Sequence, residues 1–211
     1  MVDESITQIR IALLIIFKSV GLALLLGFLY IIRSLASSAA ERRKNLRGDG
    51  KTFNRLLLAL SISDVVVSLM FFIGTWVVPK YDAEQPWTKG HRYAEDEFYA
   101  IFPYASGNDV TCSAQGFLIL LGQNAAICLT GSISIQYVLT VRFEWREAAM
   151  VKVEKILLCW SFVYPLVFAT TALSLDVIGV KYSGWCWLSG GKDIFVYAGT
   201  SVFVVTLGLH P

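Results

Sequence analysis

The stretch LALSISDVVVSLMFF, residues 58–72, is apolar apart from its serines and one carboxylate, Asp64. It lies inside a longer apolar run, Phe53 to Pro79, that exceeds the roughly 20 residues an α-helix needs to cross a bilayer. A charge at the membrane centre costs at least about 2.5 kcal/mol, so an acid persists there when it faces a polar interior. The stretch therefore predicts a membrane-spanning helix that packs in a bundle.

Four more apolar runs flank this one, at residues 11–32, 112–141, 156–175 and 194–209. Only 16% of the 211 residues are charged, against about 25% in a typical soluble domain. A domain of this size cannot hide so many long apolar runs, which argues against the alternative of buried helices in a soluble protein. We predict an all-α, polytopic membrane helix bundle, one transmembrane domain over 1–211, with spans at about 9–34, 53–79, 112–143, 152–176 and 193–211.

Basic residues are concentrated in two of the loops, which predicts the orientation of the chain. Of the 18 Lys and Arg, seven follow the first run and four separate the third run from the fourth: Arg33, Arg42, Arg43, Lys44, Arg47, Lys51 and Arg55, then Arg142, Arg146, Lys152 and Lys155. These loops are expected inside, which puts the N-terminus and the acidic loop 80–111 outside. A loop of that length is expected to have structure of its own. We expect an integral protein of the plasma membrane whose partners include membrane lipids, and no nucleic acid, because the basic loop lacks interleaved aromatics.

The four cysteines follow no zinc-binding pattern, and we predict neither a metal nor a cofactor. Cys128 and Cys159 fall inside predicted spans, whereas Cys112 and Cys186 fall on the predicted outer side. Because the exterior is oxidising, we expect Cys112 and Cys186 to form a disulfide. The alternative is two free thiols.

Polar residues in the second and third runs recur at helical spacing, so each set predicts one polar face turned toward the bundle interior. Asp64, Ser61, Ser68 and Tyr137 are predicted to be buried polar residues. The alternative role for Asp64 is a neutral hydrogen bond between helices, and Lys18, deep in the first run, could extend to the membrane surface. The two sets are Asn54, Ser61, Asp64, Ser68 and Thr75, and Gln115, Gln123, Thr130, Ser134 and Tyr137.

Five motifs in order along the chain resemble those of the seven-span G-protein-coupled receptors, most closely the cAMP-receptor-like and fungal nutrient-receptor-like group. NRLLLALSISD resembles the second helix with its buried Asp, and CSAQGF the start of the third with its disulfide Cys. VRFEWRE resembles the inner end of the third helix, and Trp160 and Pro165 the fourth. WCW, residues 185–187, resembles the second outer loop with the partner Cys. The similarity covers nearly the whole chain.

The resemblance implies a receptor whose present chain holds five spans of seven and is a fragment truncated within helix five. It implies that a small extracellular ligand contacts Gln115, Gln123 and Asn124. It also implies that a heterotrimeric G protein meets the inner surface. Arg142, Trp145 and Arg146 are its candidate contacts, and Tyr137 stands where the largest receptor family carries its activation Arg.

Two other classes of function compete with a receptor. A multi-span transporter or channel subunit would be expected to have Gly- or Pro-broken helices and internal repeats, but only Pro165 breaks a run and no repeat is found. An intramembrane enzyme would need a second acid, a His pair or a Ser–His arrangement at membrane depth. None is recognised in the sequence, so we expect no enzyme.

The charge bias generates the first testable prediction. An Asn-x-Ser/Thr acceptor placed near Gly48 should stay unmodified in a eukaryotic membrane, whereas one placed near Gly90 should be glycosylated, because only the outer side meets the modifying enzyme. A mobility shift that disappears on deglycosylation measures the result. The reverse pattern would overturn the predicted orientation.

Overall fold

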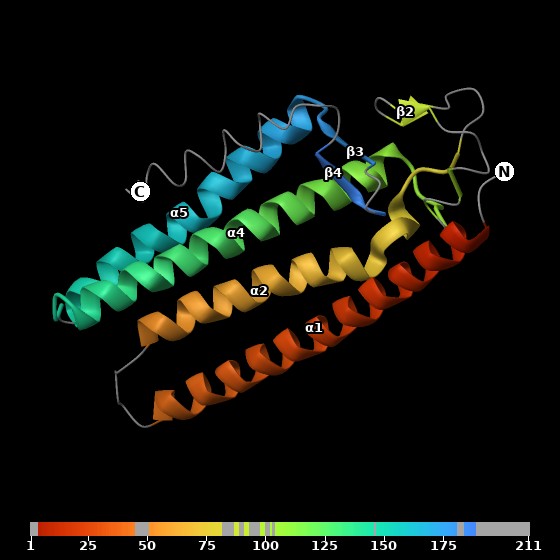
Figure 1. The fold of residues 1–211 in the computed structure, drawn as a ribbon. Helices are drawn as coiled ribbons and strands as arrows, with labels where there is room; N and C mark the ends of the chain where they lie inside the picture. Colours follow the sequence, from red (N-terminus) through yellow and green to blue (C-terminus); the bar gives the residue numbers. More distant parts are fainter. Residues whose placement is uncertain are drawn as a thin grey trace. The chain divides into compact units, whose positions relative to one another are not determined.

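The computed structural model describes residues 4–44, 51–81, 87–88, 91–92, 98–99, 102, 104–145, 147–180 and 184–188. They form mainly α-helix: α1 (Glu4–Lys44), α2 (Lys51–Ile73), α4 (Asp109–Val141) and α5 (Glu147–Ser174), as Figure 1 shows. The chain divides into two compact units. The first comprises Met1–Lys18, Ile73–Ile119 and Phe168–Pro211, and the second Ser19–Phe72 and Leu120–Val167.

Three helical segments are long and apolar enough to cross a membrane: Phe53–Val77, Asp109–Val141 and Ala149–Ser174. In their most apolar windows only 22%, 39% and 22% of the residues are buried by protein, so much of the apolar surface is left for lipid. These helices indicate an integral membrane protein and overlap the predicted spans at 53–79, 112–143 and 152–176. The predicted span at 9–34 lies within α1, and that at 193–211 lies outside the described residues, so the count of five stays a prediction.

In the second unit, small residues allow the helices to approach closely. A Cβ on Gly122 of α4 would lie 2.7 Å from Val67 Cγ2 and 3.3 Å from the Ser63 carbonyl oxygen of α2. A Cβ on Gly21 of α1 would lie 3.3 Å from the Phe72 backbone nitrogen. Such contacts are typical of membrane helices, whose association depends on close packing rather than on exclusion of water.

Polar side chains join α5 to its neighbours in the same unit. The hydroxyls of Ser132 in α4 and Ser161 in α5 are both buried and lie 3.0 Å apart. Arg55 of α2 forms an ion pair with Glu154 of α5, with Nη1 and Oε2 3.6 Å apart. The hydroxyl pair fixes the antiparallel register of α4 and α5.

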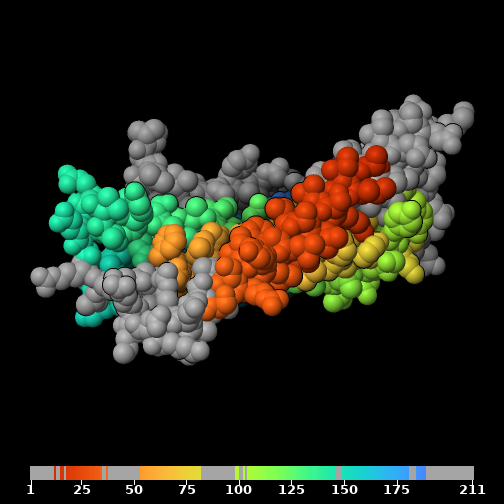
Figure 2. Space-filling view, turned by 90° about the horizontal axis from the view of Figure 1, so that it is seen from below, coloured from red at the N-terminus to blue at the C-terminus, as the bar shows by residue number. Residues whose placement is uncertain are grey.

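The outward side of α1 in this unit is apolar. Val20, Leu22, Leu26, Leu29 and Tyr30 are exposed large side chains, and Figure 2 shows this part of the helix as a continuous surface. Such a surface suits contact with lipid rather than with water.

In the first unit, the start of α4 is fixed by reciprocal hydrogen bonds. The Thr111 amide donates to Asn108 Oδ1 at 2.9 Å, and the Asn108 amide donates to Thr111 Oγ1 at 2.8 Å. This arrangement satisfies amides that a helix N-terminus otherwise leaves unpaired. The Thr111 hydroxyl also donates to the Val77 carbonyl at 2.8 Å and so joins α4 to the 3₁₀-helix η1 (Gly74–Val77).

The end of α5 is closed by a Schellman motif. The Val177 amide donates to the Ala172 carbonyl at 3.2 Å and the Asp176 amide to the Leu173 carbonyl at 3.1 Å. Asp176 has φ +50°, a left-handed conformation that Asp tolerates better than most residues. The motif turns the chain directly into strand β3.

Two short hairpins accompany the helices, which the all-α prediction did not include. β1 (Trp87–Thr88) pairs with β2 (His91–Arg92), inside the loop expected to have structure of its own. β3 (Ile178–Val180) pairs antiparallel with β4 (Cys186–Leu188), with Val180 opposite Cys186. The strands could not be predicted from periodicity because each has only two or three residues.

The β3–β4 hairpin packs on the start of α4. Cys186 is bonded to Cys112, which confirms the predicted disulfide. Both cysteines are buried in one apolar cluster with Val78, Phe98 and Phe102. Gly116 lies under the hairpin, because a Cβ there would collide with the Ile178 side chain.

The contact at Gly122 generates a prediction about stability. Gly122→Leu should lower the melting temperature in mild detergent by several degrees, because the added side chain meets Val67 and the α2 backbone. Gly27→Leu is the matched control, since apart from the neighbouring backbone of its own helix nothing lies within 4 Å of a Cβ at Gly27. Equal melting temperatures for the two variants would contradict close packing of α2 on α4.

Candidate functional site

Asp64 of α2 is flanked along its helix by three serines. Ser61, Ser63 and Ser68 are buried, and the first two donate to the carbonyls of Leu57 and Ala59 at 2.9 and 3.2 Å. Asp64 is half-buried and makes no hydrogen bond or ion pair with any residue the structure describes. Ser61 and Ser63 are thus satisfied by their own helix, whereas the acid is left available.

Helical geometry places Asp64 between two contact lines of α2. Ser63 and Val67 lie beside Gly122 of α4, and the Ser68 carbonyl and the Phe72 backbone lie beside Gly21 of α1. At 100° per residue, Asp64 falls on the strip between these two lines. The exposed Ile62 and Leu69 lie on the opposite strip. The carboxylate therefore lies on the side of α2 away from its most exposed apolar residues, as expected for a group that faces a bundle interior.

The buried side of α4 differs from the predicted polar stripe. It carries Gly122, Ala125, Cys128, Ser132 and Gln136. Gln123, Thr130, Ser134 and Tyr137 are exposed, and Tyr137 retains 66% of its accessible surface. The prediction that Tyr137 is a buried polar residue is therefore wrong for the described residues.

The physical reason is that two of these side chains need no partner helix. Thr130 Oγ1 donates to the Ala126 carbonyl at 2.8 Å, and Ser134 Oγ donates to the Thr130 carbonyl at 3.0 Å. A hydroxyl satisfied by its own backbone can face lipid at little cost. Small residues such as Gly122 and Ala125 decide which side packs.

Gln115 is buried and holds two backbone segments together. Its Nε2 donates to the Gly74 carbonyl at 3.0 Å, and its Oε1 accepts from the Cys186 amide at 2.9 Å. Gly74 has φ +57° at the start of η1, and Cys186 carries the disulfide. Gln115, predicted as a ligand contact, thus has a structural role as the brace between η1 and β4.

The two other predicted ligand contacts are placed differently. Asn124 is half-buried and its Nδ2 donates to the Leu120 carbonyl at 2.8 Å, whereas Gln123 is exposed. The first unit also holds a mainly apolar groove of about 560 Å³, lined by α4 between Asp109 and Leu118 and by Leu173 of α5. None of the three predicted contacts lines this groove.

The turn between α4 and α5 presents four exposed side chains: Arg142, Phe143, Glu144 and Trp145. Its backbone is held by bonds from the Arg142 amide to the Val138 carbonyl at 2.8 Å and from the Trp145 amide to the Leu139 carbonyl at 3.2 Å. Arg142 and Trp145 are thus free to meet a partner, as their predicted role requires. Arg146 lies outside the described residues.

Sequence reasoning missed a buried polar cluster at the same end of the second unit. Glu154 retains 4% of its accessible surface and Gln136 retains 7%, and neither Glu154 Oε2 nor Gln136 Oε1 has a hydrogen-bond partner among the described residues. The spacing of these two residues from the serine pair was the signal in the sequence that could have revealed the cluster. Glu154 lies seven residues before Ser161, and Gln136 lies four after Ser132, so each shares a helical face with a member of the serine pair.

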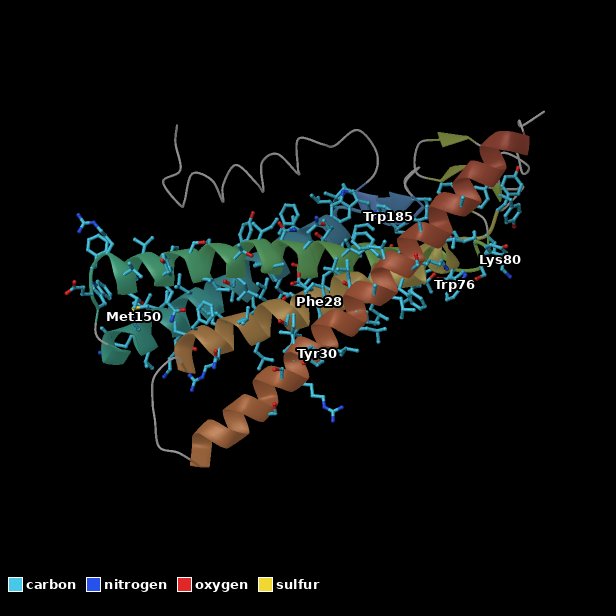
Figure 3. The ribbon with its side chains drawn as sticks, turned by 60° about the horizontal axis from the view of Figure 1, so that its bottom comes forward. Phe28, Tyr30, Trp76, Lys80, Met150 and Trp185 are labelled. Atoms are coloured by element: carbon cyan, nitrogen blue, oxygen red, sulfur yellow. A yellow bond between two sulfur atoms is a disulfide. The ribbon has the colours of Figure 1, made fainter. Side chains whose placement is uncertain are left out.

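Lys18 is paired with an aromatic ring in the first unit. Its Nζ lies 3.4 Å from the ring centroid of Trp76, labelled in Figure 3. A cation over an indole face is stabilised by the ring quadrupole, most strongly where water is scarce. This contact accounts for a lysine within an apolar run.

Comparison with protein-family models, with curated protein sequences and with solved structures finds no match to this chain. The functional argument therefore depends on the residues and their geometry.

The brace role of Gln115 is tested by Gln115→Leu. The substitution leaves the Gly74 carbonyl and the Cys186 amide without their partner, and each buried unpaired group costs about 1–3 kcal/mol. We expect a lower melting temperature and faster reduction of the Cys112–Cys186 bond by a mild thiol, measured by alkylation and mass spectrometry. Gln123→Leu on the same helix is the control and should change neither. Equal rates of disulfide reduction in both variants would contradict the structural role of Gln115.

Proposed function

We propose that this chain is a receptor-like membrane protein of the seven-helix G-protein-coupled type. Its five predicted spans would correspond to helices one to five, in the plasma membrane with the N-terminus outside. It would sense a small extracellular ligand and couple it to a cytoplasmic heterotrimeric G protein. The observation that carries the proposal is the disulfide between the start of α4 and the β3–β4 hairpin, which agrees with the pairing implied by the sequence resemblance.

The β3–β4 hairpin supports a role in ligand sensing, because several contacts make this part of the loop rigid. The disulfide, the Gln115 bonds and the pairing of β3 with β4 hold the same backbone near Cys186. A stiff hairpin at the ligand-facing end lowers the entropy cost of binding, because fewer residues must be ordered. Of the three predicted ligand contacts, half-buried Asn124 in the second unit stays a candidate by itself.

Coupling requires two states of the bundle with different affinity for ligand. Asp64 is suited to such a difference, because it has no partner among the described residues and lies on the strip between the α1 and α4 contacts. A shift of a neighbouring helix changes the partners available to this carboxylate. The exposed Arg142, Phe143 and Trp145 form the surface that would report the state to a G protein.

The second candidate is a transporter or channel subunit. Two acids within spans, Asp64 and Glu154, favour it, because intramembrane carboxylates often mark ion or proton pathways. Ion flux into liposomes that contain the purified chain distinguishes this function from a receptor, which gives none.

The receptor proposal is tested by photocrosslinking to a purified heterotrimeric G protein. Benzoylphenylalanine at Phe143 should capture the α subunit, and a non-hydrolysable GTP analogue should abolish the product, because receptors release activated G proteins. The same probe at Tyr104, which is equally exposed but lies in the predicted outer loop, is the control. No nucleotide-sensitive product at Phe143, together with ion flux in liposomes, would reject the receptor in favour of the transporter.

A further inference from the structure

One end of the second unit is strongly basic. It is the end where α2 and α5 begin and α4 finishes, and Met150, labelled in Figure 3, belongs to it. Of the side chains described in this unit, Glu144 is the exposed acid, whereas five bases are exposed: Arg33, Arg55, Arg142, Lys152 and Lys155. Four of them, Arg55, Arg142, Lys152 and Lys155, belong to the ends of α2, α4 and α5 named above, and we call these four residues the basic end.

Among the described residues, Arg55 is the member of the basic end that forms an ion pair, and its hold on the partner is weak. Its Nη1 lies 3.6 Å from Glu154 Oε2, which is an ion-pair distance but too long for a hydrogen bond. Its side chain retains 61% of its accessible surface. A guanidinium has five donors in a planar fork, so Arg55 can bind a second anion without leaving Glu154 entirely.

Two buried acceptors at this end of the unit are incompletely satisfied. Glu154 Oε2 and Gln136 Oε1 both lack hydrogen-bond partners among the described residues. The Ser132–Ser161 contact sets the register of α4 and α5, which puts Gln136 one turn and Glu154 two turns beyond that contact. The two side chains thus belong to one seam, about one turn apart, and the Glu154 carboxylate attracts the guanidinium inward.

Exposed apolar side chains lie among these bases, which identifies the environment they meet. Phe53, Phe143 and Ile156 are 44%, 61% and 69% exposed, close in sequence to Arg55, Arg142 and Lys155. Apolar and basic side chains at the end of membrane-spanning helices lie at the depth of lipid headgroups, where anionic lipids attract clustered Lys and Arg.

We propose that the basic end binds the phosphate headgroups of anionic lipids in the adjoining leaflet. Arg55 divides its guanidinium between a lipid phosphate outside and the Glu154–Gln136 seam inside. Lipid binding therefore weakens the contact between α2 and α5, and loss of that contact strengthens lipid binding. This site goes beyond the receptor proposal and holds equally for a transporter.

The test uses the 211-residue chain in nanodiscs of phosphatidylcholine with a small fraction of phosphatidylinositol bisphosphate, with bound lipid counted by native mass spectrometry. Arg55→Gln should weaken binding about fivefold, the effect of one basic residue at a lipid surface. Lys80→Gln is the matched control, because Lys80 is exposed and follows the other end of the same span. Glu154→Gln should strengthen binding, because it releases the guanidinium.

Two results would overturn the site. The first is equal binding by Arg55→Gln and Lys80→Gln variants whose melting temperatures match that of the parent. The second is weaker binding by Glu154→Gln, which would mean that Glu154 positions Arg55 for the lipid instead of competing with it.

Two competition arms separate the possible sources of the anion. The first arm measures binding of a soluble inositol phosphate to the protein in discs of phosphatidylcholine alone. Binding as tight as that of the anionic lipid would show that the ligand of the site is a free phosphate compound and not a lipid. The second arm measures binding of a glutamate-rich peptide. If the peptide binds and the anionic lipid does not, the partner of this surface is an acidic protein segment. Binding of the lipid that exceeds both supports the proposal.

Discussion

Lipid offers no hydrogen bonds, and this constraint explains where the polar residues of the spans lie. Ser61, Ser63, Thr130 and Ser134 donate to the carbonyl four residues earlier in their own helix. A side chain satisfied in this way can face lipid or a neighbouring helix with little difference in free energy. Serines and threonines in these spans therefore say little about which side of a helix packs.

Side chains that cannot reach their own backbone depend on other segments. Gln115 finds its donor and acceptor in η1 and β4, and this joins the disulfide-bonded hairpin to the start of α4. Among the described residues Glu154 has only a distant guanidinium as a partner, so it makes the beginning of α5 sensitive to the position of Arg55. The same physical demand thus produces a rigid brace in one unit and a weakly held ion pair in the other.

This difference bears on how the protein would work. A braced hairpin presents a stable surface to a ligand, whereas the exposed guanidinium of Arg55 can engage a second anion while it stays near Glu154. Asp64 resembles Glu154 in lacking a close hydrogen bond among the described residues. Both acids would respond to a shift of neighbouring helices, which is the property that a receptor or a transporter requires.

The sequence by itself determined the helical segments of three spans and the pairing of Cys112 with Cys186. The length of an apolar run can be read from the sequence, and so can the side of the membrane on which each cysteine is expected. The oxidising exterior then favours the disulfide, so neither prediction needed tertiary information. The tertiary structure decided which side of α4 is buried, because close packing at Gly122 and Ala125 outweighs hydroxyls that bond to their own helix. It also decided that Gln115 braces backbone, and that Arg55 of α2 meets Glu154 of α5. These contacts join residues 41, 71 and 99 positions apart, and only the packing of helices brings such partners together.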